Sequence, residues 1–232
     1  MVSVFGRVDA TERRCYASRA SLQTLRERTP LLNAPIKRRI VLGSTSRYRR
    51  ALLTRLQIPF ITAAPNCDER AWSGLSPDLL AVTLARAKAT SIPTPGSLII
   101  GSDQVVDLGG EILHKPGTEA AACAQLAKLS GRTHRLITAV AVHDTVTGAT
   151  LDAVDIHTMH MRTLSEAQIA RYIAHDKPLD CAGSYMLEKR GIALFERIEA
   201  DPETADDSAI VGLPVMKTLT LLRRLGYEIL DV

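Results

Sequence analysis

Hydroxyl groups and positive charges are concentrated in residues 43–50, GSTSRYRR. Ser44 and Ser46 can donate hydrogen bonds from their hydroxyls, and Arg49 and Arg50 can pair with oxyanions through their guanidinium groups. Branched apolar residues before this stretch are typical of a buried strand, and Ser46 is well suited to begin a helix. Because the free N–H groups at a helix start bind anions, the stretch predicts a phosphate site. A solvated basic turn is the alternative.

The arginines stand at the end of the expected helix where they cost stability. Arg47, Arg49 and Arg50 fall in its first turn, where the helix macrodipole is already positive, and each charge there costs about 0.3–1 kcal/mol. A helix selected for stability alone would carry acidic residues at these positions. We therefore expect Arg49 to serve binding, and its removal to leave stability nearly unchanged.

Two carboxylates and two lysines elsewhere in the chain could bind a metal, activate a water or neutralise negative charge. Asp103 stands in the middle of an apolar strand, where a carboxylate must be paired, hydrated or bound to a metal. Glu69 follows the expected strand at residues 58–64, and Lys88 and Lys115 add positive charge. Two carboxylates can hold a divalent metal or activate a water, and cations can neutralise a polyphosphate, as phosphoanhydride hydrolysis requires. Surface ion pairs are the alternative for each of these residues.

Strand and helix patterns are mixed along the chain, and hairpins interrupt their alternation. The pattern predicts an α/β fold in which helices flank a mixed twisted central sheet, with a cleft between two lobes. We expect the acidic loop at residues 200–209 to be merely solvated. The expected helices lie at residues 77–91, 119–129, 166–174 and 214–226, and further strands at 97–107, 135–142, 151–161 and 191–198.

Residues 1–36 differ in charge from the rest of the 232-residue chain. They hold six arginines against three acidic residues, which is +3 of the formal net charge of +4. We expect a poorly ordered basic extension, or a start codon placed too early, followed by one domain at residues 37–232. The basic character therefore does not predict a stable nucleic-acid partner.

Cysteine spacing and hydropathy indicate the compartment. The 4 cysteines form no C-x-x-C pair, which suits reduced thiols in a cytoplasm. No apolar run approaches the ~20 residues of a membrane span, so we expect no membrane association.

Seven motifs, in order between residues 39 and 215, resemble those of the Maf family of nucleoside triphosphate pyrophosphatases. The extension at residues 1–36 lies outside the resemblance. The motifs are Gly43-Ser44-Thr45-Ser46-x-x-Arg49-Arg50, Asp68-Glu69, Ala85-Arg86-Ala87-Lys88-Ala89, Gly101-Ser102-Asp103-Gln104, Lys115-Pro116, Cys181-Ala182-Gly183-Ser184 and Val211-Gly212-Leu213-Pro214.

The resemblance implies a Maf-like fold around a nucleotide cleft and the conversion of a nucleoside triphosphate to its monophosphate and diphosphate. It implies a divalent cation, Mg²⁺ or Mn²⁺, with Glu69 and Asp103 as ligands. Asp103 is expected to accept the proton of the attacking water or, as a metal-bound carboxylate, to orient that water. The residues expected to hold phosphates are Ser44, Ser46, Arg49, Arg50, Lys88 and Lys115.

Within the family, the chain looks most similar to the subgroup that hydrolyses 7-methyl-GTP. An aromatic residue precedes the double arginine (Tyr48), Gln104 follows the catalytic aspartate, and Glu188 follows the Gly-Ser turn. These three residues are expected to set substrate specificity. Two departures are visible, since Arg47 stands where the family usually has Pro and Tyr48 where this subgroup often has Trp.

Two other functions stay open at this point. One is hydrolysis of dTTP or UTP, which another subgroup of the same family carries out. The other is a nucleotide- or RNA-binding module without catalysis, in which the basic extension would matter. A homodimer is also left open.

Overall fold

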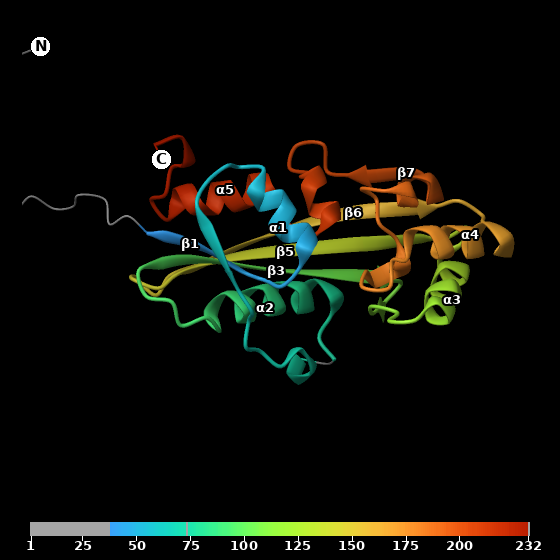
Figure 1. Cartoon of the computed structure of the whole chain (residues 1–232), viewed down its shortest axis with the longest axis horizontal. Helices are drawn as coiled ribbons and strands as arrows, with labels where there is room; N and C mark the ends of the chain where they lie inside the picture. The colour runs from blue at the N-terminus through green and yellow to red at the C-terminus, as the bar shows by residue number, and fades with distance from the viewer. Residues whose placement is uncertain (1–37, 73, 232) are drawn as a thin grey trace, which may run out of the picture. The chain divides into compact units, whose positions relative to one another are not determined.

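A computed structural model describes residues 38–72 and 74–231 (Figure 1). The predicted N-terminal extension and its boundary at residue 36 lie outside these residues. The strands are β1 (Arg39–Gly43), β2 (Phe60–Ala63), β3 (Ser97–Leu108), β4 (Glu111–Leu113), β5 (Thr133–Asp144), β6 (Thr150–Met161) and β7 (Phe195–Ala200).

All seven strands join one sheet, in the order β2-β1-β3-β5-β6-β7, with β4 beside β3. The first three strands run parallel to one another, and the remaining pairs are antiparallel. The predicted mixed central sheet in an α/β fold is therefore confirmed.

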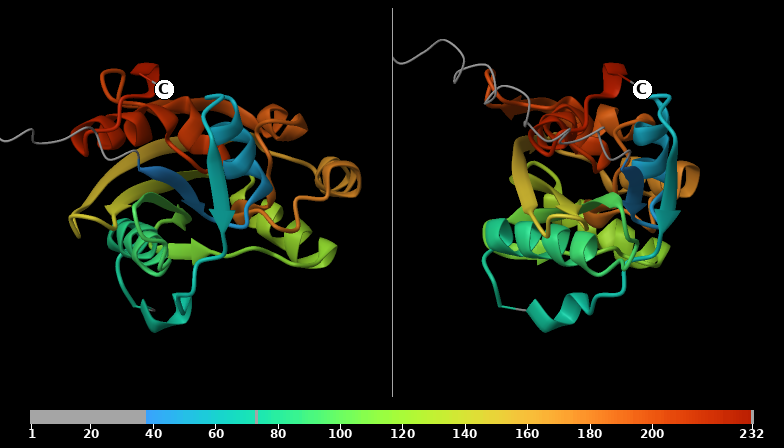
Figure 2. Two further views of the ribbon diagram at one scale, coloured as in Figure 1. Left: turned by 60° about the vertical axis from the view of Figure 1, so that its left-hand side comes forward. Right: turned by 90° about the vertical axis from the view of Figure 1, so that its left-hand side faces the viewer.

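Five α-helices in the described residues flank the sheet: α1 (Arg47–Thr54), α2 (Pro77–Thr90), α3 (Glu119–Leu129), α4 (Glu166–Asp176) and α5 (Val215–Arg224). Figures 1 and 2 show α2 on one face of the sheet and α1 and α5 on the other, with α3 and α4 at one end of the long strands. Ser165 and Gln168 form the expected capping box at the start of α4. None of the helices in residues 38–72 and 74–231 is long and apolar enough to cross a membrane.

Apolar side chains form separate cores at the two ends of the long strands. Leu98 and Ile100 of β3 pack with α1 and α5, whereas Val106 and Leu108 belong to a second core with α3 and α4. A smaller core lies under α2 on the other face of the sheet. The middle of β3, between its two apolar ends, carries the polar residues that the sequence singled out.

Along one edge, β3 pairs first with β1 and then with β4. β1 pairs with residues 97–101, and β4 pairs with residues 106–108. On the opposite edge, β5 pairs continuously with β3 from Leu98 to Asp107. Residues 102–105 therefore face a gap between the end of β1 and β4, and Asp103 and Gln104 lie in it.

The expected strand at residues 191–198 is only partly correct. Residues Arg190–Leu194 form a 3₁₀ helix, and β7 begins at Phe195. The reason is a tight turn in which the Gly191 N–H donates to the Met186 carbonyl over 3.0 Å. A Cβ atom at this glycine would lie 2.3 Å from the same oxygen, so the chain is held against Met186 and cannot extend.

Gly101 allows α2 to pack directly on β3. A Cβ atom there would lie 2.3 Å from the Ala85 carbonyl oxygen and 2.5 Å from the Ala89 nitrogen. Because these are backbone atoms, Gly101→Ala should lower the free energy of unfolding by about 3 kcal/mol or more in urea titrations.

The control is Gly148→Ala in the β5–β6 turn, where φ is 75° and no atom lies within 4 Å of the new Cβ. This variant should lose only the strain of positive φ, about 1–2 kcal/mol. Equal losses in the two variants would contradict the close packing at Gly101.

Candidate functional site

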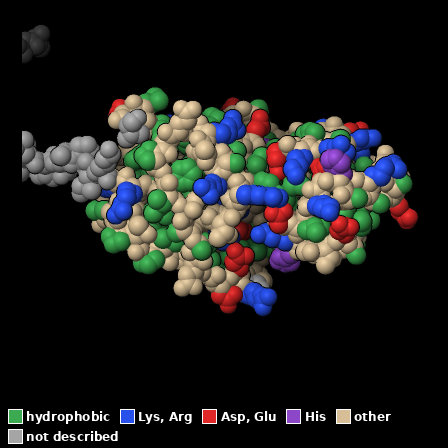
Figure 3. Space-filling model, in the orientation of Figure 1, with side chains coloured by type: hydrophobic (Ala, Val, Ile, Leu, Met, Phe, Trp, Pro, Cys, Tyr) green, Lys and Arg blue, Asp and Glu red, His purple; other side chains and the backbone are tan. Residues whose placement is uncertain are grey.

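A pocket of about 430 Å³ opens at the gap beside β3. Figure 3 shows basic and acidic side chains gathered over the middle of this face, between α1 and the α3–α4 end. Most of the predicted site residues line this one pocket, although they come from six separate parts of the sequence. They are Ser44, Ser46, Tyr48, Arg49, Glu69, Lys88, Gln104, Lys115 and Glu188.

Two predicted residues are not in the pocket wall. Asp103 is buried, and one of its oxygens contacts Lys88, which does line the pocket. Arg50 is exposed and borders a different depression, together with Ile58 and Phe60. Its predicted role in phosphate binding therefore finds no support in this geometry.

The β1–α1 loop presents donors to one end of the pocket. Ser46 caps α1 by accepting from the Arg49 N–H over 3.4 Å, and Ser44 Oγ accepts from the Ser46 N–H over 3.1 Å. Within the described part of the chain, neither hydroxyl donates its own proton to an acceptor. The loop can therefore offer hydroxyl and helix N–H donors to an anion, as the sequence predicts.

Lys88 joins the two predicted metal ligands. Its Nζ lies 2.6 Å from Asp103 Oδ1 and 2.8 Å from Glu69 Oε1, and the lysine is only 6% exposed. Partial burial alone would raise the pKa of Glu69, but the hydrogen bond and charge of Lys88 outweigh it, and this pKa lies below its usual value. The ammonium therefore favours the ionised form of Glu69 beside the pocket.

The donor set suits a hard divalent cation. Asp103 Oδ2 and Glu69 Oε2 accept no hydrogen bond within residues 38–72 and 74–231, and carboxylate oxygens are the ligands that Mg²⁺ prefers. No three His, Cys, Asp or Glu side chains gather at one point in that same part of the chain. The chain would thus supply two carboxylates and leave the other positions to phosphate and water, as is usual for Mg²⁺.

Arg49 has a structural contact that the sequence did not reveal. Its Nε donates to the Gly212 carbonyl over 2.7 Å, and burial lowers its pKa, although the charges of Asp103 and Glu69 oppose that shift. Its Nη1 lies 3.5 Å from Ser44 Oγ, at the limit of a hydrogen bond. The expectation that removing Arg49 leaves stability unchanged must be revised, because the Gly212 carbonyl would lose a donor.

The other end of the pocket is aromatic, apolar and acidic. Tyr48, Tyr185 and Leu187 line it together with the carboxylates of Asp180 and Glu188. The Tyr48 hydroxyl lies 3.0 Å from Met186 Sδ and 3.4 Å from Asp180 Oδ1, and burial raises its pKa.

Glu188 is exposed and is free to contact a ligand. Cys181 also lines this end, but burial raises the pKa of its thiol to about 12, so it is no nucleophile near neutral pH.

Gln104 supports the loop that closes the pocket floor. Its Nε2 donates to the carbonyls of Ala209 and Ile210, over 2.9 and 3.1 Å, and to Thr138 Oγ1 over 3.0 Å. Because these contacts use Nε2, the predicted contact between Gln104 and a base would have to be made by the amide oxygen, Oε1.

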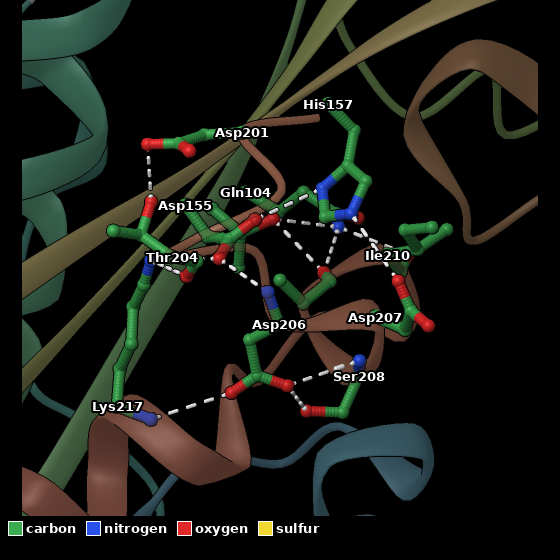
Figure 4. Close-up of polar contacts among 12 residues, drawn as sticks. Gln104, Asp155, His157, Asp201, Thr204, Asp206, Asp207, Ser208, Ile210 and Lys217 are labelled. Carbon is green, nitrogen blue, oxygen red and sulfur yellow. Dashed lines mark hydrogen bonds and ion pairs between the residues drawn. The ribbon is translucent and has the colours of Figure 1, made fainter. Parts of the chain in front are cut away.

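Asp206 was missed by the sequence, because the acidic loop at residues 200–209 was expected to be merely solvated. Asp206 is 3% exposed, and its carboxylate accepts from the Ser208 N–H over 3.2 Å (Figure 4). It also accepts from the Met216 N–H over 2.6 Å. Its own N–H donates to Asp155 Oδ2, which also contacts Lys217 Nζ at 2.8 Å. The expectation was wrong here because this aspartate caps the turn that carries Ile210 and Gly212 into the pocket wall. The only available sequence signal was the Asp-x-Ser spacing of a side-chain turn.

Comparison with known proteins gives a consistent result. The Maf-like protein family model matches residues 39–225. A protein of Albidiferax ferrireducens named 7-methyl-GTP pyrophosphatase is 44% identical over 202 residues, 86% of this chain and 99% of its own length.

Proteins with the same name from Xanthomonas oryzae pv. oryzae and Vibrio vulnificus are similar too. They are 45% identical over 193 residues and 44% over 194. Each match covers 82% of this chain, and 98% and 97% of the two relatives. The chain therefore belongs to the Maf family.

Proposed function

We propose that this protein hydrolyses 7-methyl-GTP to 7-methyl-GMP and diphosphate. The observation that carries the proposal is that one pocket has two chemically different ends. One end gathers hydroxyls, helix N–H groups and cations around two carboxylates, and the other presents a tyrosine and the carboxylates of Asp180 and Glu188. The names of the relatives that match nearly their full length support this substrate.

The phosphate end would bind and orient the triphosphate. Ser44, Ser46 and the N–H groups at the start of α1 donate to phosphate oxygens, while Arg49 and Lys115 offset their charge. Arg49 is already fixed by Gly212, so little side-chain entropy is lost when phosphate binds.

Asp103 Oδ2, the oxygen that Lys88 leaves free, is proposed to accept the proton of the attacking water or, as a metal-bound carboxylate oxygen, to orient that water while its proton passes to solvent. The water oxygen forms a new bond to the α-phosphorus. The bond from the α-phosphorus to the oxygen that bridges it to the β-phosphorus breaks, and diphosphate leaves with that oxygen. A divalent cation held by Asp103 and Glu69 would supply charge neutralisation on the phosphate oxygens. Lys88 keeps the two carboxylates in place.

The base end would recognise the methylated guanine. Methylation at N7 gives the ring a positive charge, which favours stacking on Tyr48 and a contact with an anion. The N1–H and N2 amino donors of guanine match the two oxygens of Glu188. We place the reaction in the cytoplasm, where Cys67, Cys123 and Cys181, which form no disulfide, would remain reduced.

Asp103→Asn should lower kcat by about 10²–10⁴-fold, because the amide keeps the shape but loses the proton acceptor and the anionic oxygen. Diphosphate release from 7-methyl-GTP is the assay. The loss of one charged partner of Lys88 should lower the melting temperature, and a cooperative melting transition would show that the fold survives. Wild-type turnover in the purified variant would remove Asp103 from the mechanism.

Arg49→Ala should raise KM for the triphosphate, lower kcat and also reduce stability by about 1–3 kcal/mol, since the Gly212 carbonyl loses its charged donor and keeps only Ser102 Oγ. Arg50→Ala is the matched comparison on the same helix turn. Because Arg50 lies outside the pocket, its variant should keep wild-type kinetics. A comparable rise in KM for Arg50→Ala would restore its predicted phosphate role.

Glu188→Gln should narrow the preference for 7-methyl-GTP over GTP, measured as the ratio of kcat/KM values. A charged hydrogen bond contributes about 1.5–3 kcal/mol. Because the Glu188 carboxylate is exposed, we expect the preference to fall by the lower of these values, about 1.5 kcal/mol. The wild-type enzyme should also prefer 7-methyl-GTP to UTP and dTTP. A higher kcat/KM for UTP or dTTP than for 7-methyl-GTP would reject 7-methyl-GTP as the substrate. It would still support a nucleoside triphosphate pyrophosphatase.

A further inference from the structure

Arg47 forms a bridge across the base end of the pocket. Its Nη2 donates to the Tyr48 hydroxyl over 2.6 Å and lies 3.6 Å from Asp180 Oδ2. The bridge joins the first turn of α1 to the segment before Cys181. None of these contacts involves the residues that hold phosphate or carry out hydrolysis.

The same guanidinium lies over the tyrosine ring. The Arg47 guanidinium carbon is 4.8 Å from the centre of the Tyr48 ring, within the range of a cation–π contact. One face of the ring is therefore occupied by a positive charge from the protein itself. A base that stacks on Tyr48 must use the other face or displace Arg47.

The Tyr48 ring has little freedom to turn away from this charge. Its hydroxyl is held by Arg47, by Met186 Sδ at 3.0 Å and by Asp180 Oδ1 at 3.4 Å. A ligand on the other face would thus meet a ring whose first face is fixed against a cation.

We propose that Arg47 and Asp180 are an opposed pair of specificity-determining residues, which tune how strongly this site prefers a cationic base to a neutral one. The inference rests on the proposed function, because it assumes that the base lies against Tyr48. Arg47 repels a methylated, positively charged guanine but has little effect on neutral guanine. Asp180, on the same side of the pocket, attracts the charged base.

A purely mechanical bridge would behave differently. If the contact between Arg47 and Asp180 served only to hold the pocket wall, loss of either partner would break it, and both variants would change base preference in the same direction. If charge is what matters, the two variants must change it in opposite directions. The sign of the two effects therefore separates the two explanations.

The experiment measures the ratio of kcat/KM for 7-methyl-GTP to that for GTP. Arg47→Gln, which keeps most of the side-chain stem and removes the charge, should raise the ratio by about 3- to 10-fold. Asp180→Asn should lower it by a similar factor. Arg55→Gln removes one positive charge from the same segment outside the pocket and is the control, with an unchanged ratio.

Binding of 7-methyl-GMP and GMP to the same variants, followed by calorimetry, supplies a second measurement that does not depend on turnover. Opposite changes in the affinity ratio would support the proposal even if the wild-type enzyme released no diphosphate, an outcome that would reject only the proposed function. Changes of the same sign in the two variants, or none in either while both melt like the wild type, would overturn the inference.

Discussion

The contact of Lys88 with two carboxylates is the interaction on which the site depends. A buried ammonium is costly to desolvate, and the cost is offset only because Asp103 and Glu69 both lie within 2.8 Å of Nζ. Their two negative charges exceed its one positive charge, so one negative charge remains for a cation. Lys88 lies on α2, and Gly101 lets the backbone of this helix approach β3 closely. This close approach brings the Lys88 ammonium within contact distance of Asp103.

A second junction lies on the opposite face of β3. The Gly212 carbonyl accepts from Arg49 Nε over 2.7 Å and from Ser102 Oγ over 2.9 Å, so it joins α1, β3 and the loop before α5. Side chains alternate along a strand, so Ser102 and Gln104 face this loop while Asp103 faces Lys88. Ser102 and Asp103 thus support the pocket from behind, through their contacts with Gly212 and Lys88, which line it together with Gln104. The gap beside β3 lets a ligand reach between these two groups.

The order of the elements and most of the pocket could be predicted from the sequence. Strand and helix patterns, the capping box at Ser165 and the placement of the motifs at turns are local features that the residues themselves determine. Contacts between distant residues were not predictable in the same way. Arg49 and Gly212 lie 163 residues apart, and only the fold shows that an arginine in an unfavourable helix position also stabilises a loop. The burial of Asp206 depends likewise on Asp155, 51 residues away.

The two ends of the pocket differ in how solvent acts on their charges. Lys88 and Asp103 have side chains that are 8% and 11% exposed, so their interaction is weakly screened and changes little with ionic strength. Arg47 and Asp180 are 66% and 53% exposed, so each contributes little and is sensitive to salt. Under the proposed function, substitutions at the base end can therefore shift specificity in small steps without disturbing Asp103 and Glu69. This separation allows the chain to carry Arg47 and Tyr48 at the base end while the contacts of Lys88 with Asp103 and Glu69 stay intact.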